Sequence, residues 1–87
     1  MSEQTVQDSR LAVAALVVED PDRVAELNGL LHQCSPYIVG RMGIPCRNRG
    51  VCLISVALDA PGEVISALTG RLGRLPGVSV KTAYSKV

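Results

Sequence analysis

Two stretches of the chain are apolar at almost every position. Residues 11–18 (LAVAALVV) and residues 51–58 (VCLISVAL) are each about eight residues long and contain no charged side chain. Short runs that are apolar on both faces are typical of strands in the middle of a sheet. The pattern therefore predicts two central strands at these positions.

Two further strands are predicted from weaker patterns. Residues 37–44 (YIVGRMGI) contain two glycines and precede Pro45, which favours an edge strand or a strand with a bulge. Residues 47–50 (RNRG) have the composition of a turn that joins this strand to the next. A last strand is predicted from Val78 toward Tyr84.

Two segments with helical periodicity lie between these strands. Asp20 and Pro21 form a helix start, an acceptor side chain at the cap followed by a proline at the first helical position, and Ser35 and Pro36 end that helix. A second helix is predicted to start within residues 59–62 (DAPG). The apolar faces recur at three- and four-residue steps and comprise Val24, Leu27, Leu30, Leu31 and Cys34, then Val64, Ile65, Leu68, Leu72 and Leu75.

The elements follow the order strand, helix, strand, strand, helix, strand. Two βαβ units that share one sheet place both helices on the same face of that sheet. The predicted fold class is therefore α+β, a ferredoxin-like or ACT-like βαββαβ sandwich whose four-stranded antiparallel sheet has the strand order 4-1-3-2. In this interpretation residues 10–87 form a single ACT-like domain, and residues 1–9 form a disordered N-terminal tail.

The helices can cover only one face of such a sheet, yet the central strands are apolar on both faces. The uncovered set contains Leu11, Val13, Val17, Val51 and Leu53. An exposed apolar patch of this size is uncommon on a monomer and usually marks an interface. We therefore expect a homo-oligomer, a dimer or a higher assembly, with a protein partner as the other occupant of this face. The N-terminal tail is too polar to cover it.

Composition narrows the function classes. The 87 residues have a net charge of +1, no Trp or Phe, and no apolar run long enough for a transmembrane helix. The central strands contain no aromatic residue on which a base could stack, so we expect neither direct nucleic-acid binding nor a membrane partner. Three cysteines without a secretion signal favour reduced thiols and a cytoplasmic location.

The first candidate ligand site is the link between the first strand and the first helix. Several charged side chains lie close together at the start of the helix, namely Glu19, Asp20, Asp22 and Arg23. The carboxylates suit a cation or an ammonium group. The alternative is that Asp20 and Asp22 only cap the helix and complement its dipole, because capping explains the same residue types.

The second candidate ligand site is the predicted edge strand and the turn after it. Its residues are Gly40, Arg41, Met42, Gly43 and Arg49. Glycines let a ligand or a neighbouring subunit approach the backbone, and arginines can hold a carboxylate or a phosphate with two parallel hydrogen bonds. The alternative is that charges and bulges protect an edge strand against aggregation.

His32, Cys34 and Cys46 are weak candidates for a metal site. The sequence has no CxxC or HxxxH pair, and His32 and Cys34 lie two residues apart on a helix, so they point to different faces. We therefore expect no metal and no other cofactor, only an unidentified small ligand.

Enzyme chemistry is not expected either. Acylphosphatases of this topology cradle phosphate after the first strand, and here that loop is acidic and would repel phosphate. A cysteine nucleophile needs a paired base, and nothing in the sequence links His32, the only histidine, to Cys46.

Four segments carry a more specific pattern. They are residues 17–20 (VVED), 38–45 (IVGRMGIP), 49–51 (RGV) and 68–81 (LTGRLGRLPGVSVK). Together they resemble the iron-only hydrogenase system regulator family of small ACT-like proteins, over almost the whole predicted domain. The resemblance implies a ferredoxin-like fold, an oligomer and a regulatory role linked to hydrogenase maturation. It also implies relatedness in fold to amino-acid-sensing ACT domains and to the ligand-binding half of the nickel-responsive repressor, and it brings no catalytic residues.

These observations lead to one functional hypothesis and two alternatives. The chain is interpreted as a non-enzymatic, oligomeric module that senses a small ligand and regulates through a shift between assembly or partner-bound states in the iron-only hydrogenase system. The alternatives are a nickel- or iron-binding sensor or carrier, and a purely structural protein-interaction module.

Overall fold

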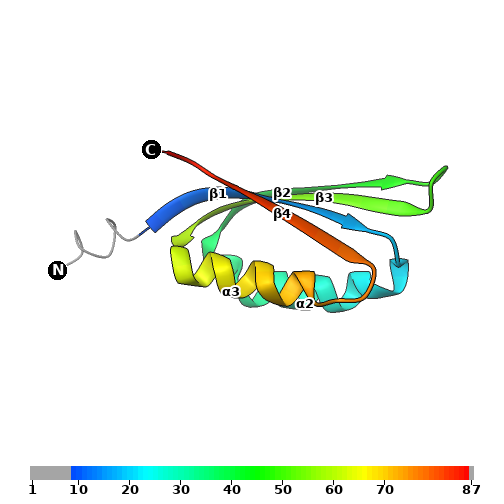
Figure 1. Cartoon of the computed structure of the whole chain (residues 1–87), viewed down its shortest axis with the longest axis horizontal. Helices are drawn as coiled ribbons and strands as arrows, with labels where there is room; N and C mark the ends of the chain where they lie inside the picture. The colour runs from blue at the N-terminus through cyan, green and yellow to red at the C-terminus, as the bar shows by residue number, and fades with distance from the viewer. Residues whose placement is uncertain (1–8, 87) are drawn as a thin grey trace.

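In the described part of the chain, residues 9–86, four strands and two α-helices form two layers. The computed structural model has both helices on one side of the sheet, as Figure 1 shows. The elements are β1 (Ser9–Val18), the short 3₁₀ helix η1 (Pro21–Arg23), α2 (Val24–Gln33), the short 3₁₀ helix η2 (Ser35–Tyr37), β2 (Ile38–Cys46), β3 (Val51–Pro61), α3 (Gly62–Gly73) and β4 (Val78–Tyr84). The order of strands and helices is the predicted one.

The sheet has the strand order β2-β3-β1-β4, and every neighbouring pair is antiparallel. Leu16 of β1 lies opposite Ile54 of β3 on one side and opposite Val80 of β4 on the other. The two runs that are apolar at almost every position are therefore the two central strands. This confirms the predicted ferredoxin-like α+β fold.

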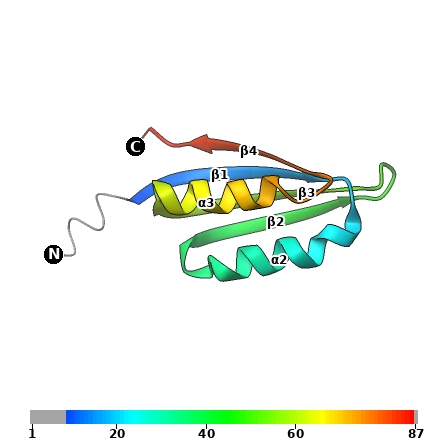
Figure 2. The same cartoon turned by 60° about the horizontal axis from the view of Figure 1, so that its bottom comes forward.

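The core lies between the sheet and the helices. In Figure 2 the helices lie side by side, with α3 over the centre of the sheet and α2 toward β2. Alternate residues of the central strands point into this layer, as expected for a period of two. The buried residues are Ala12, Ala14, Leu16 and Val18 of β1, Ile54, Val56, Leu58 and Ala60 of β3, Leu27 and Leu31 of α2, Ile65, Leu68 and Leu72 of α3, and Val78 of β4.

Strand β3 is longer than predicted. Asp59 and Ala60, expected at the start of the second helix, belong to the strand, because Ala60 is fully buried and pairs with Arg10 of β1. Helix α3 then begins at Gly62, and no side chain caps it. The helix therefore begins at the last residue of the segment predicted to start it, and the strand was predicted three residues too short.

The first strand and the first helix also differ from prediction at their ends. β1 begins at Ser9, which pairs with Pro61, so Ser9 belongs to the sheet and not to the predicted tail. The rest of that tail, residues 1–8, lies outside the described residues. The chain after Asp20 makes a 3₁₀ turn before α2 begins at Val24. Neither α-helix in residues 9–86 is long and apolar enough to cross a lipid bilayer.

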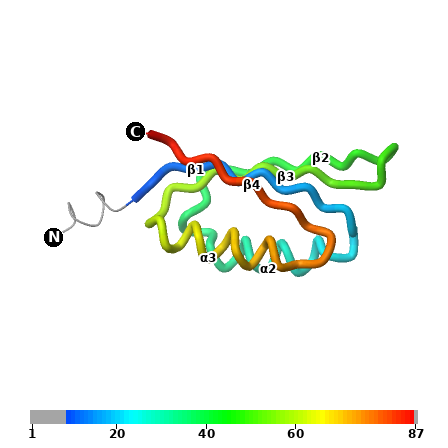
Figure 3. The backbone as a smooth tube through the Cα atoms, in the orientation of Figure 1, coloured from blue at the N-terminus to red at the C-terminus, as the bar shows by residue number. Residues whose placement is uncertain are grey.

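The β2–β3 hairpin extends past the helical layer. Figure 3 shows its tip projecting beyond the ends of both helices. Gly50 in this turn has a φ of +68°, a conformation that favours glycine. At its other end, β2 has a register shift between Ile38 and Gly40, where Val39 is the extra residue. β2 is thus an edge strand with a bulge, as the glycines and Pro45 predict.

Candidate functional site

Asp20 organises the loop between β1 and α2. Its Oδ1 accepts a hydrogen bond from the backbone N–H of Asp22 (3.0 Å), and its carbonyl oxygen accepts one from the N–H of Arg23 (3.0 Å). These bonds satisfy N–H groups that the first turn leaves without a partner. The geometry supports the capping interpretation of Asp20.

Arg23 lies between two carboxylates. Its Nε is 3.4 Å from Asp20 Oδ2, and its Nη1 pairs with Glu26. The hydrogen bond with Asp20 and the charge of Glu26 raise the pKa of Arg23 above its ordinary value. The guanidinium is therefore engaged within its own loop and helix.

Glu19 connects this loop to the turn before β4. Its backbone N–H donates to the carbonyl oxygen of Gly77 at 2.7 Å, while its side chain is exposed. Gly77 has a φ of +76°, and a Cβ there would lie only 3.0 Å from the Cβ of Asp20. The structure thus brings Glu19, Asp20 and Arg23 to one end of the sheet, beside a turn that needs glycine.

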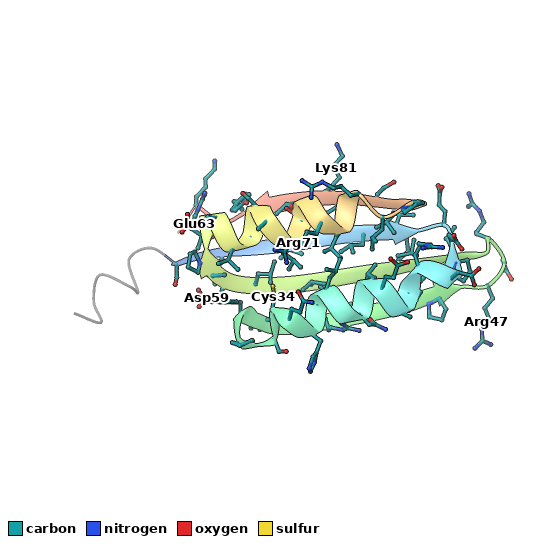
Figure 4. All side chains as sticks on the ribbon, turned by 90° about the horizontal axis from the view of Figure 1, so that it is seen from below. Cys34, Arg47, Asp59, Glu63, Arg71 and Lys81 are labelled. Carbon is teal, nitrogen blue, oxygen red and sulfur yellow. The ribbon has the colours of Figure 1, made fainter. Side chains whose placement is uncertain are left out.

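The residues of the second candidate ligand site do not form one cluster. Side chains alternate along β2, so Arg41 and Met42 point to opposite faces of the sheet. Met42 is 60% exposed on the face without helices, whereas Arg41 Nη2 donates to Asn28 Oδ1 of α2 at 2.8 Å. Arg49 lies in the turn at the tip of the hairpin, and Figure 4 shows its neighbour Arg47 at this far end. Arg41 and Arg49 therefore lie far apart and do not form one site.

His32, Cys34 and Cys46 are also separated. His32 borders a hollow between α2 and β2, Cys34 packs against the core, and Cys46 ends β2. Figure 4 shows Cys34 in the space between the helices and away from the hairpin. Among residues 9–86 no group of three His, Cys, Asp or Glu side chains could hold a metal ion.

The face of the sheet opposite the helices is apolar. Leu11 and Val13 are each 45% exposed, and Val17 and Leu53, which pair with each other, are exposed farther along the same face. Val51, predicted with this set, is half-buried at the start of β3. We call the outer apolar face the exposed set that consists of Leu11, Val13, Val17, Val39, Met42, Ile44 and Leu53.

Three members of the outer apolar face come from β2 and were not among the residues that the sequence predicted for this face. In the observed register Ile44 lies opposite Leu53, and Met42 lies opposite Ser55. The spacing of two residues between Met42 and Ile44 was a usable signal for a shared face. The position of Val39 on this face could not be predicted from residue spacing, because the bulge interrupts the alternation.

The outer apolar face is hollowed at two places. One hollow of about 400 Å³ lies toward the end where β1 begins, and its lining includes Leu11, Val13, Val39, Ala57 and Ala83. A smaller hollow of about 230 Å³ is lined by residues that include Val17, Met42, Ile44 and Leu53. The surface is therefore uneven and could receive protruding side chains.

The edge along β4 is more polar. Ser79 lies opposite Val17 and Lys81 lies opposite Ala15, so both share the outer side of the sheet. Figure 4 shows Lys81 pointing away from the strands. The apolar area is thus centred on β1, β3 and β2 and is bounded by charge along β4.

These features define the class of the protein. It is a ferredoxin-like α+β domain with two helices on one face of the sheet and an exposed apolar surface on the other. The chain belongs to the TM1266-like family, described as "Iron-only hydrogenase system regulator, putative", whose sequence profile matches residues 10–82. No curated protein matches the chain in sequence.

Solved structures agree with this assignment. The uncharacterized protein TM1266 from Thermotoga maritima is similar over 90% of this chain and 99% of that chain, with 34% identity and a TM-score of 0.86. The C-terminal domain of MgtC from Mycobacterium tuberculosis has 14% identity and a TM-score of 0.71 over 92% of both chains. CPII from Thiomonas intermedia K12, a nitrogen regulatory PII-like protein, has 15% identity and a TM-score of 0.59 over 90% of this chain and 91% of its own. The last two likenesses show the fold alone.

Proposed function

We propose that this protein is a non-enzymatic regulatory module of the iron-only hydrogenase system that works as a homo-oligomer and senses a small ligand. Family membership supports the regulatory role and the link to hydrogenase. The observation that carries the proposal is the outer apolar face, because a surface of this kind needs a partner.

The sheet is large enough for a modest interface. Four strands about 4.8 Å apart and about nine residues long present roughly 550 Å² of flat area. This is roughly two thirds of the ~800 Å² of accessible surface that each partner of a standard stable interface buries. Burial of only about 400 Å² of apolar surface contributes about 10 kcal/mol before the costs of association. A second copy of this chain, packed sheet to sheet, therefore suffices as the occupant.

Charge placement supports pairing over the centre of the sheet. The outer apolar face lies on β1, β2 and β3, and Lys81 is at its border on β4. A two-fold arrangement buries the same patch on both subunits. It can leave Lys81 of each copy at the rim, where charged residues are usual in interfaces.

Sensing requires a ligand that binds one assembly state better than another. A ligand shifts an equilibrium only through its differential affinity for the two states. The loop that holds Glu19, Asp20 and Arg23 and the strand that holds Gly40, Arg41, Met42 and Gly43 remain the candidate places for that ligand. The reduced thiols Cys34, Cys46 and Cys52 fit a cytoplasmic protein, the compartment that we propose.

The first test is the molar mass of the purified protein in solution, measured by light scattering during size-exclusion chromatography. We expect a dimer or a larger assembly for the unmodified chain. Val13→Lys places a charge in the centre of the outer apolar face, and we expect it to weaken association at least 100-fold. Ala25→Lys adds the same charge at an exposed position on α2 and should leave the assembly unchanged.

A monomeric mass for the unmodified chain at tens of micromolar would contradict the proposal. A mass that Val13→Lys and Ala25→Lys reduce equally would also contradict it, because the effect would then come from net charge. A panel of amino acids and divalent metals, added before the same measurement, tests sensing: a change of mass or of melting temperature with one ligand class supports it.

A further inference from the structure

A second surface, on the helical side of the molecule, gathers hydrogen-bond donors around a hollow. The hollow has a volume of about 390 Å³, lies between α2 and the edge strand β2, and is lined by Asn28, Leu31, His32, Ser35, Ile38 and Arg41. This volume is within the range of small-ligand sites. Figure 2 shows α2 running alongside β2, which brings these two elements together.

Local structure explains why the polar groups converge. Asn28 and His32 are four residues apart on α2, so they lie on the same helix face one turn apart. Arg41 points to the same side because it alternates with Met42, which belongs to the outer apolar face. Leu31 is fully buried and Ile38 packs against the core, so the hollow has an apolar floor.

Arg41 is held in place by a hydrogen bond and does not form an ion pair with a carboxylate of the described residues. Its Nη2 donates to Asn28 Oδ1 at 2.8 Å, across two elements that are distant in sequence. Within residues 9–86, the ion pairs are those of Arg23 with Asp20 and Glu26, and no carboxylate side chain is among the described residues that line the hollow. The guanidinium therefore keeps its charge and its remaining N–H donors.

The neighbouring groups add donors and few acceptors. Because Asn28 Oδ1 accepts from Arg41, the amide nitrogen of Asn28 remains a donor. Ser35 Oγ donates to the carbonyl oxygen of His32, and the N–H of Cys34 donates to the carbonyl oxygen of Leu31. Two of the carbonyl groups that the end of α2 leaves without intrahelical partners are thus already bonded.

We propose that this hollow binds a small molecule through an oxyanion group, a carboxylate or a phosphate. Arg41 holds two oxygens of that group side by side, since its planar fork matches the geometry of both oxyanions. Asn28 orients Arg41 and donates to the ligand, and the imidazole N–H of His32 contributes a further donor. The proposal gives the sensing part of the proposed function a site and a ligand class, and it rests on that part.

The site is separate in space from the outer apolar face. Arg41 and Asn28 lie on the helical side of the sheet, opposite Leu11, Val13 and Leu53. A sheet-to-sheet dimer leaves the hollow open to solvent. Failure of anion binding and failure of association can therefore be told apart in the same preparation.

The test is a titration of the full chain, labelled with ¹⁵N, followed by two-dimensional amide NMR. Inorganic phosphate and acetate are the probes, each compared with sodium chloride at equal ionic strength. We expect saturable shifts that are confined to the amides around Asn28, His32 and Arg41, at millimolar probe concentrations. Saturation by phosphate alone assigns a phosphate group to the ligand, and saturation by acetate as well extends the class to carboxylates.

Matched variants decide the role of Arg41. Arg41→Gln should weaken probe binding at least tenfold, and Arg41→Lys should also weaken it because lysine lacks the planar fork. Arg74→Gln removes the same charge from an exposed position after α3 and should leave binding unchanged. Shifts that do not saturate with either probe, or that Arg41→Gln and Arg74→Gln reduce equally, would overturn the proposal.

Discussion

The two faces of strand β1 have nearly the same composition, but one face is buried and the other is exposed. Ala12, Ala14, Leu16 and Val18 face the helices and are at most 5% exposed, whereas Leu11, Val13, Ala15 and Val17 face away and are all exposed. Neither set contains a polar residue. The difference arises only because α2 and α3 cover one side of the sheet. It shows that the chain completes one core by itself and leaves a second apolar surface uncovered.

Leucine truncation on the inner face should have the largest effect. Leu16→Ala removes a side chain that is 1% exposed, so we expect the free energy of unfolding to fall by about 3 kcal/mol through lost burial and a cavity. Urea unfolding followed by circular dichroism measures this change. A loss below about 1 kcal/mol would break the distinction between the two faces.

The contact that closes one end of the inner layer should have the next largest effect. Gly77→Ala places a Cβ on a residue with a left-handed backbone conformation, 3.0 Å from Asp20 Cβ. We therefore expect the free energy of unfolding to fall by about 2 kcal/mol. Gly70→Ala is the control, because a Cβ there meets nothing within 4 Å and α3 favours alanine. Thermal unfolding should show a lower melting temperature for the first variant and an equal or higher one for the second.

The cap at the start of the first helical turn should have a smaller effect. Asp20→Ala removes the acceptor of the Asp22 N–H, and we expect a loss of about 1 kcal/mol. Asp20→Asn keeps an acceptor oxygen at the same place and should recover most of it. If the free energy of unfolding falls by the same amount in both variants, the charge of Asp20 matters more than its capping bond.

Leucine truncation on the outer face should have the smallest effect in the isolated subunit. Leu11→Ala makes the same chemical change as Leu16→Ala at a side chain that is 45% exposed, and we expect a change within about 0.5 kcal/mol in dilute protein. At high protein concentration the loss should grow, because association stabilises the folded state by mass action. Unfolding curves recorded over a 100-fold range of concentration test this. A loss that is independent of concentration would sharply weaken the proposed role of this face.

Most of the fold could be predicted from the sequence because the signals were local. The runs 11–18 and 51–58 and the periodic helix faces needed no knowledge of the tertiary structure. The boundaries at Asp59 and Ala60 depended instead on pairing with β1, since a strand continues for as long as it has a neighbour and a buried face. The DAPG sequence resembles a helix start and contains no sign of that neighbour.

The candidate sites were harder to predict because they depend on which side of a strand a residue faces. Gly40, Arg41, Met42 and Gly43 are contiguous, yet the alternation of side chains along β2 divides them between two surfaces. Asn28, the partner of Arg41, carries no distinctive pattern in its own segment. Asp20 and Arg23 were predicted to lie together and do, although their contacts with each other and with Glu26 account for much of their chemistry.

The register of β1 also determines when the protein can fold. β1 precedes both of its partners, β3 and β4, in the sequence, and its Ala12 lies opposite Tyr84. Contacts between residues that are far apart in the sequence must wait for loop closure, which slows folding. On the ribosome this apolar strand therefore stays incompletely paired until β4 has emerged. The nascent protein has to keep the run LAVAALVV from associating with other chains during that interval.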